Sequence, residues 1–329
     1  TKSGESVRKN LLNDFNVIHV WDLGDTRLFE AAVLPAILLL EKGHAKQKLG
    51  EQRFTSIYLK GKNEKIAPDL VFDALENKKC ENFKVIHGRL DTGNKLGDTW
   101  RLAHIEANNW LQQVRKKTKL LFKEIGKVRV GVKTTADNVF IVSDLNQFNG
   151  DLPETLRSLI THHVARRYKA EKPTKYIVYT HELSHGKRIS IDLENYPKTK
   201  KYLELHKEKL TSRGYVIESG RNWHEIWVPH NPGAWKAPKL VFRDISERPV
   251  FWMDLSKSVV NGDCYWLAVD SEKKSELLWL ALAVANSKFI EEFYDHSFNN
   301  KLYSGRRRFI TQYVEKFPLP DPNTEIAKN

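Results

Sequence analysis

Hydrophobic and polar residues along this chain recur with periods that predict both helices and strands. Residues 6–12 have the spacing of an amphipathic helix, residues 17–21 alternate as a strand does, and residues 33–40 form an apolar run that predicts a second strand. A helix followed by two strands cannot bury both faces of a sheet by itself. Residues 1–45 are therefore predicted to be the tail of a larger α/β domain.

The rest of the chain has a different pattern. Residues 46–119 are mixed and basic and are predicted to be a partly helical connecting segment, whose helix runs over 104–123. Residues 120–329 predict a mixed α+β domain, in which residues 128–142 form a strand, a turn and a second strand with a basic tip. Further strands are predicted at 176–179, 188–191, 239–242 and 264–269, and helices at 199–212 and 275–295.

Composition narrows the class of partner. The 329 residues carry a net charge of +13, with 40% hydrophobic and 11% aromatic residues, which is ample for sizeable cores. A basic, aromatic-rich protein favours a polyanion, with nucleic acid ahead of an anionic membrane. Cys80 and Cys264 alone cannot make a disulfide framework. No signal peptide or bilayer-spanning run is visible, so we expect a cytoplasmic protein without a membrane partner.

Two short motifs resemble catalytic signatures, and both are rejected. His181-Glu-Leu-Ser-His185 has the letters of a zinc protease motif, which requires both histidines on one helical face. A strand-like run precedes it and Gly186 follows, which predicts a hairpin turn instead. Pro68-Asp69 with Glu76-Asn-Lys78 matches a loose nuclease pattern, but residues 69–76 predict one helix rather than two strands. No phosphate-binding loop or nucleophile elbow occurs, so no catalytic residue and no metal ligand is predicted.

Basic residues recur at the ends of predicted elements and alternate with aromatics. Lysines and hydroxyl groups suit phosphates, whereas arginine and asparagine can read base edges. Arg306, Arg307 and Arg308 follow Gly305 and place three guanidinium groups together, and residues 317–322 are rich in proline and predict the end of a domain. These loops favour contact with nucleic acid over a plain solvated surface.

An ordered set of segments is similar to a known family. They are residues 128–142 (VRVGVKTTADNVFIV), 223–227 (WHEIW), 239–246 (KLVFRDIS), 285–287 (ANS), 300–309 (NKLYSGRRRF) and 317–320 (FPLP). In this order they resemble the TaqI-like specificity domain of adenine-N6 DNA methyltransferases from restriction–modification systems, type IIG-like enzymes included. Residues 8–12, 18–24, 29–33 and 37–40 look like the last helix and strands of that family's Rossmann-like catalytic domain.

The resemblance implies that DNA recognition and catalysis lie in different parts of the parent enzyme. The family's S-adenosylmethionine motif and its Asn-Pro-Pro-Tyr/Phe tetrapeptide, which holds the flipped adenine, are both missing from these residues. We therefore expect no cofactor in this chain and no methylation by it alone. The expected partners are double-stranded DNA and the missing catalytic domain of the parent enzyme, which would use S-adenosylmethionine.

Twelve residues are the predicted DNA contacts. Those expected to position the phosphates are Lys133, Thr135, Lys169, Lys187, Lys236 and Lys301. Those expected to read bases or enter a groove are Asn138, Arg188, Arg221, Arg306, Arg307 and Arg308. Two other functions stay open: a basic module that docks an acidic protein, and, remotely, a zinc hydrolase built on His181, Glu182 and His185.

Overall fold

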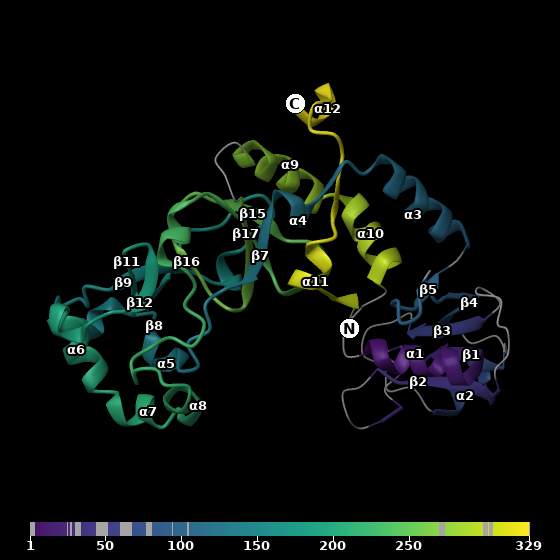
Figure 1. Ribbon diagram of the computed structural model, residues 1–329, viewed down its shortest axis with the longest axis horizontal. Coiled ribbons are helices and arrows are strands. Elements are labelled where there is room, and N and C mark those ends of the chain that lie inside the picture. The colour runs from purple at the N-terminus through teal and green to yellow at the C-terminus, as the bar shows by residue number, and fades with distance from the viewer. Residues whose placement is uncertain are drawn as a thin grey trace. The chain divides into compact units, whose positions relative to one another are not determined.

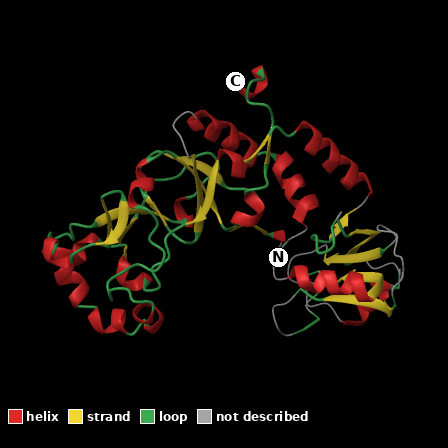
Figure 2. Ribbon diagram, in the orientation of Figure 1, coloured by secondary structure: helices red, strands yellow, loops and turns green. Residues whose placement is uncertain are grey.

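The computed structural model describes residues 4–328, apart from 25, 27, 30–33, 44–51, 60–67, 77–80, 94, 104, 270–273, 299–301, 303 and 304. The chain divides into two compact units, one made of residues 1–117 and 292–306 and the other of residues 118–291 and 307–329. Helices and strands mix in both units, so the fold is α/β and α+β as predicted (Figure 2). Within the described residues, no helix has the length and apolar composition needed to cross a membrane.

Unit 1 is built on a five-stranded sheet with the order β2-β1-β3-β4-β5 (Figure 1). Its β1–β3 pair is parallel and the other pairs are antiparallel. The elements are α1 (Glu5–Asp14), β1 (Phe15–Asp22), β2 (Ala36–Lys42), β3 (Arg53–Leu59), α2 (Pro68–Leu75), β4 (Phe83–Asp91), β5 (Arg101–Ala103) and α3 (Ile105–Lys117), with most of α10 (Lys288–Phe298).

Both faces of this sheet carry a core, because side chains alternate along each strand. Phe54 of β3 packs with Val17 and Val20 on one face, and Ile57 packs with Val71 of α2 on the other. The sheet thus extends into residues 53–103, which the sequence assigned to a connecting segment. Helix α1 and strand β1 confirm the predicted elements at 6–12 and 17–21.

Strand β2 shows where the predicted apolar strand lies and how it is exposed. It runs over Ala36–Lys42, whereas the predicted strand began at Val33, which lies outside the described residues. As the edge strand of the sheet it leaves Ile37, Leu38 and Leu39 between 40% and 45% exposed. The predicted second strand is therefore present, and it lies at the open edge of the sheet.

Unit 2 contains two four-stranded sheets, with the orders β15-β13-β17-β7 and β16-β9-β10-β8, and three two-stranded pairs. The strands are β6 (Leu120–Leu121), β7 (Gly126–Val130), β8 (Ile141–Val142), β9 (Leu156–Ile160), β10 (Lys175–Val178), β11 (His181–Ser184), β12 (Lys187–Ser190), β13 (Lys239–Arg243), β14 (Ile245–Ser246), β15 (Phe251–Asp254), β16 (Val259–Val260), β17 (Cys264–Val269), β18 (Arg307–Arg308) and β19 (Pro318–Leu319).

Short helices connect and cover these sheets. They are α4 (Phe122–Ile125), α5 (Asp137–Phe140), η2 (Leu145–Phe148), η3 (His162–Val164), η4 (Leu193–Asn195), α6 (Pro197–Glu204), α7 (Lys207–Thr211), α8 (Gly214–Glu218), η5 (Pro232–Lys236), α9 (Ser275–Ala285), α11 (Thr311–Val314) and α12 (Glu325–Lys328). One core joins both four-stranded sheets and contains Trp235, Trp252 and Trp266, all at most 1% exposed. For these three tryptophans, core packing is confirmed.

The predicted hairpin over residues 128–142 is wrong. Strand β7 pairs with β17 and β8 pairs with β10, so the segment crosses from one sheet to the other. The expected second strand begins instead as α5, which occupies Asp137–Phe140. A turn can be inferred from nearby residues, but the partner of each strand lies far away in the sequence, where local spacing carries no signal.

One predicted helix ends earlier than expected, and two others are divided. The helix predicted at 104–123 is α3, which ends at Lys117 because Leu120 and Leu121 pair with Leu319 and Pro318 as β6 and β19. That pairing also gives the proline-rich run a short strand. The helix predicted at 199–212 is divided into α6 and α7. The helix predicted at 275–295 divides into α9 and α10 near Asn286, whose buried side chain bonds both backbone groups of Phe251.

Candidate nucleic-acid interface

Two glycines bring two distant segments of unit 2 into backbone contact. The amide of Gly131 donates to the carbonyl of Cys264 at 2.8 Å, and that of Val132 donates to Val260 at 2.7 Å. A Cβ on Gly131 would lie 2.0 Å from the carbonyl oxygen of Asn261, and one on Gly262 would lie 2.8 Å from that of Val132. Only glycine permits this approach at both positions. This close approach of the two backbones places residues 131–133 directly beside residues 260–263.

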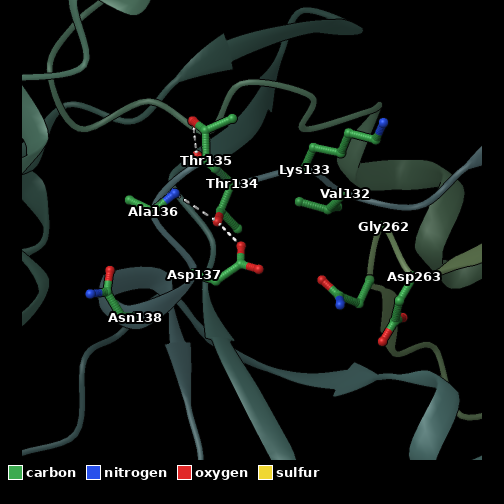
Figure 3. Close-up of a pocket in the computed structure, with 10 residues that line it drawn as sticks. Val132, Lys133, Thr134, Thr135, Ala136, Asp137, Asn138, Gly262 and Asp263 are labelled. Atoms are coloured by element: carbon green, nitrogen blue, oxygen red, sulfur yellow. Dashed lines mark hydrogen bonds between the residues drawn. The ribbon is translucent and has the colours of Figure 1, made fainter. Parts of the chain in front are cut away.

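The next residues form a short, ordered loop, residues 133–138, which we call the contact loop (Figure 3). The hydroxyl of Thr134 accepts a hydrogen bond from the amide of Ala136 at 3.1 Å and donates one to Oδ1 of Asp137. Thr135 has φ of +61°, in the left-handed region that a β-branched residue rarely adopts. The loop therefore contains a strained residue, Thr135, and a carboxylate, that of Asp137, whose position is fixed by the hydroxyl of Thr134.

The contact loop and the turn at 261–263 border an open hollow of about 670 Å³. Seven of its ten lining residues have polar or charged side chains; the ten are Val132, Lys133, Thr134, Thr135, Ala136, Asp137, Asn138, Asn261, Gly262 and Asp263. Three predicted contacts, Lys133, Thr135 and Asn138, lie here, and all three are exposed. On the opposite wall, Oδ2 of Asp263 lies 2.6 Å from Nδ1 of His162 and 3.3 Å from its amide nitrogen.

The loop is supported from below by Arg213, which is 6% exposed. Its Nη1 donates to the carbonyl of Thr134 at 3.0 Å, its Nη2 to that of Trp223 at 2.5 Å and its Nε to that of Leu210 at 3.2 Å. Burial lowers the pKa of this guanidinium. The sequence analysis did not identify Arg213, because the residue it supports lies 79 positions away.

A second basic area surrounds the hairpin of β11 and β12. Lys187 and Arg188 are exposed on β12, after a turn in which His185 and Gly186 both have positive φ. Strand β11 packs against η5, at whose end Lys236 is exposed. Three predicted contacts therefore lie on β12 and η5, and both of these elements contact β11.

The other predicted contacts are placed separately, and some already have partners. Nη1 of Arg221 donates to the carbonyl of Trp227 at 2.5 Å, and its guanidinium lies 4.5 Å from the centre of that ring. Lys169 is exposed in a turn closed by its own carbonyl and the amide of Arg166. None of the eight described contacts beyond Lys133, Thr135 and Asn138 lines the hollow.

The arginine cluster is partly built into a strand. Arg307 and Arg308 form β18, which pairs with β14, and Phe309 behind them is fully buried. Arg307 donates to the carbonyl of Glu247, and Nε of Arg308 lies 3.4 Å from Asp244 Oδ1. Arg306 is exposed, and Lys301 lies outside the described residues. Two of the three arginines therefore lie on a strand.

The zinc motif is confirmed as a hairpin. His181 lies on strand β11 and His185 lies in the turn after it, so the two rings do not share a helical face. Nε2 of His181 lies 3.3 Å from Oε2 of Glu225, and burial lowers the pKa of His181 to about 4. Glu182 accepts a hydrogen bond from Tyr196 at 2.6 Å. In the part of the chain that the structure describes, no three His, Cys, Asp or Glu side chains are grouped to hold a metal.

Residues 166–319 match the model of the TaqI-like C-terminal specificity domain. Over these residues the chain is similar to that family. The type II methyltransferase M.BanIII of Aneurinibacillus aneurinilyticus is 35% identical over 346 residues, covering 99% of this chain and 59% of that protein. The type II methyltransferase M.BstVI of Geobacillus stearothermophilus is 23% identical and covers 98% of this chain and 56% of that protein. The chain thus spans less than two thirds of the length of these relatives.

Two solved structures of restriction–modification enzymes are similar over much of the chain. The type IIG restriction endonuclease BpuSI has a TM-score of 0.44 and 12% identity, covering 99% of this chain and 39% of that one. The type IIL restriction–modification enzyme MmeI, solved in complex with DNA, has a TM-score of 0.46 and 11% identity, covering 85% of this chain and 40% of that one. Both scores are below 0.5 and add no weight to a functional argument.

Proposed function

We propose that this chain is the sequence-reading portion of a DNA methyltransferase of a restriction–modification system, and that its ligand is double-stranded DNA. The match of residues 166–319 to a specificity domain carries this proposal. The 35% identity with a type II methyltransferase over almost the whole chain extends it to the residues before that domain. A net charge of +13 suits a partner with a continuous phosphate backbone.

The chemistry of the parent enzyme is part of the same proposal. It would transfer a methyl group from S-adenosylmethionine to the N6 amino group of an adenine in the cytoplasm. The cofactor motif and the Asn-Pro-Pro-Tyr/Phe tetrapeptide do not occur in this sequence, so the cofactor is proposed to bind outside it. The catalytic domain, which would hold the cofactor, is the proposed partner of this chain in the same polypeptide.

The exposed contact residues are proposed to act in two groups. Lys133, Lys187 and Lys236 are exposed on unit 2 and would hold phosphates. Such contacts fix the register of the protein on DNA and make binding salt-dependent. Arg188 and Asn138 are exposed beside them and would read base edges. Arg221 is also proposed to read a base edge or enter a groove, while part of its guanidinium stays hydrogen-bonded to the carbonyl of Trp227.

Binding of the whole chain to a randomised duplex pool, at two salt concentrations, tests the proposal. Enrichment of one short motif is the expected result, because a specificity domain discriminates between base pairs. Salt-sensitive retention without enrichment would mean that the chain supplies charge and needs its catalytic domain to read bases. No retention at low salt would overturn DNA binding and favour a module that docks an acidic protein.

A further inference from the structure

Two carboxylates and one cationic side chain line the hollow beside the contact loop. Among its lining residues, Asp137 and Asp263 carry carboxylates and Lys133 alone carries a cationic side chain, in a chain with a net charge of +13. A phosphate placed here would meet two like charges. Between these two carboxylates a neutral ligand is therefore favoured over a phosphate, and Lys133 is the lining residue that suits the phosphate contact proposed for it.

The two carboxylates also define which hydrogen bonds the ligand must make. Asp137 is held by the hydroxyl of Thr134 (Figure 3), and Asp263 is held by the ring and the amide of His162. Ionised carboxylates accept hydrogen bonds and cannot donate them. On an exposed base edge, the donors that match are the exocyclic amino groups, N6 of adenine and N4 of cytosine in the major groove and N2 of guanine in the minor groove.

Arg213 explains how this surface keeps its shape. A buried cation is expensive in free energy unless its donors are satisfied, and Arg213 satisfies them with three backbone carbonyls rather than with a carboxylate. It is also stacked 5.4 Å from the ring centre of Phe140, at the end of α5. One of those carbonyls belongs to Thr134, immediately before the left-handed Thr135. A strained residue held by a buried clamp is typical of a functional surface.

We propose that the hollow lined by residues 132–138 and 261–263 is where this chain reads the exocyclic amino group of a base, and that Arg213 is the positioning residue that keeps the contact loop in shape for it. The inference rests on the proposed binding of duplex DNA and adds the chemical group that this site recognises. It gives Asp137 and Asp263 the role of hydrogen-bond acceptors for an amino group, whereas their negative charge would oppose phosphate binding.

A double-mutant cycle between protein and DNA tests the ligand. The DNA is the duplex enriched from the pool, with one base at a time replaced by an analogue that lacks only the amino group: purine for adenine, inosine for guanine, and pyrimidin-2-one for cytosine. The protein is the whole chain or its Asp137→Asn variant, in which the amide oxygen can still accept the hydrogen bond from Thr134. Glu218→Gln is the control, because Glu218 is an exposed carboxylate on α8 outside the hollow.

At one position, the analogue should weaken binding of the unchanged chain by about fivefold to a hundredfold, the usual cost of losing a good base contact. The same analogue should weaken binding of Asp137→Asn much less, and that of Glu218→Gln as much as that of the unchanged chain. Equal losses in all three proteins at every position would overturn the amino-group reading while leaving sequence-specific binding intact. No enrichment by the unchanged chain would instead overturn the proposed function.

Arg213→Lys tests the positioning role. Lysine keeps the charge and loses the planar fork that reaches three carbonyls. We expect the ratio of affinities for the enriched and a scrambled duplex to fall about tenfold, with little change in affinity for the scrambled duplex. Lys239→Met, which removes another buried cation of unit 2, should lower stability and leave that ratio unchanged. A ratio unaltered in Arg213→Lys, with the variant folded by circular dichroism, would overturn the role of Arg213.

Discussion

Replacing Gly131 by alanine is expected to damage the base of the contact loop. The new Cβ would lie 2.0 Å from the carbonyl oxygen of Asn261 and 2.6 Å from that of Val260. Both neighbours are backbone atoms, so no side-chain rotation can relieve the overlap. Residues 131–132 must move away from residues 260–264 instead.

The size of the effect follows from what that movement breaks. It lengthens the hydrogen bonds from the amide of Gly131 to Cys264 and from the amide of Val132 to Val260, now 2.8 Å and 2.7 Å long. Each is worth ~1 kcal/mol net, and forcing an extra carbon into a packed site costs ~1–3 kcal/mol. We therefore expect the free energy of unfolding to fall by ~3–5 kcal/mol, which corresponds to a fall of ~10 °C in Tm for a domain of this size.

Urea unfolding followed by tryptophan fluorescence measures this difference, since three tryptophans lie in the core of unit 2. Gly214→Ala is the matched control, because its Cβ would meet only Oε1 of the flexible Glu218 side chain, at 3.4 Å. That change should be neutral or slightly stabilising. If the free energies of unfolding of Gly131→Ala and Gly214→Ala differ by less than 1 kcal/mol, the close backbone approach is not what shapes the loop.

Three other predictions follow from particular groups. Lys239→Met leaves the buried carboxylate of Asp254, now 2.6 Å from Nζ of Lys239, without its partner and should cost ~3–5 kcal/mol of unfolding free energy; the double change with Asp254→Leu should recover most of it. Burial lowers the pKa of His181 to about 4, so as the pH falls the unfolded chain binds a proton at this residue before the folded chain does. The stability contributed by neutral His181 should therefore be lost as the pH falls from about 6.5 to about 4. An unfolding free energy of the unchanged chain that is the same at pH 7 and pH 5, as in His181→Asn, would contradict this. Changing Arg306, Arg307 and Arg308 together to alanine should weaken duplex binding at least tenfold and flatten its salt dependence; unchanged affinity would remove the cluster from the interface.

The local pattern of residue types was sufficient to predict an element where neighbouring residues determine its structure. Strand β13 and strand β17 follow from runs of apolar residues, and the hairpin of β11 and β12 follows from the glycine between two short alternating runs. The basic, polar tip after residue 132 also identified Lys133, Thr135 and Asn138, which line the hollow. Side-chain type and spacing carry these features, and both are visible in the sequence.

Contacts between distant residues decided the rest. The segment at 128–142 was expected to be a hairpin, and its two strands pair instead with β17 and β10. The helix predicted at 275–295 is divided near Asn286, which bonds Phe251 at a distance of 35 residues in sequence. His162 and Asp263 are 101 residues apart, so no local spacing could show that they form one wall of the hollow.

The sequence by itself determined the class of the protein: an aromatic-rich, basic α/β and α+β chain whose ordered motifs resemble a specificity domain. Those properties depend on which residues are present and in what order. Only the tertiary structure decided that a buried Arg213 supports the contact loop and that two carboxylates line the hollow beside it. The physical reason is that burial and hydrogen bonding are properties of atoms brought together by folding, and the sequence separation of these residues leaves no periodic trace.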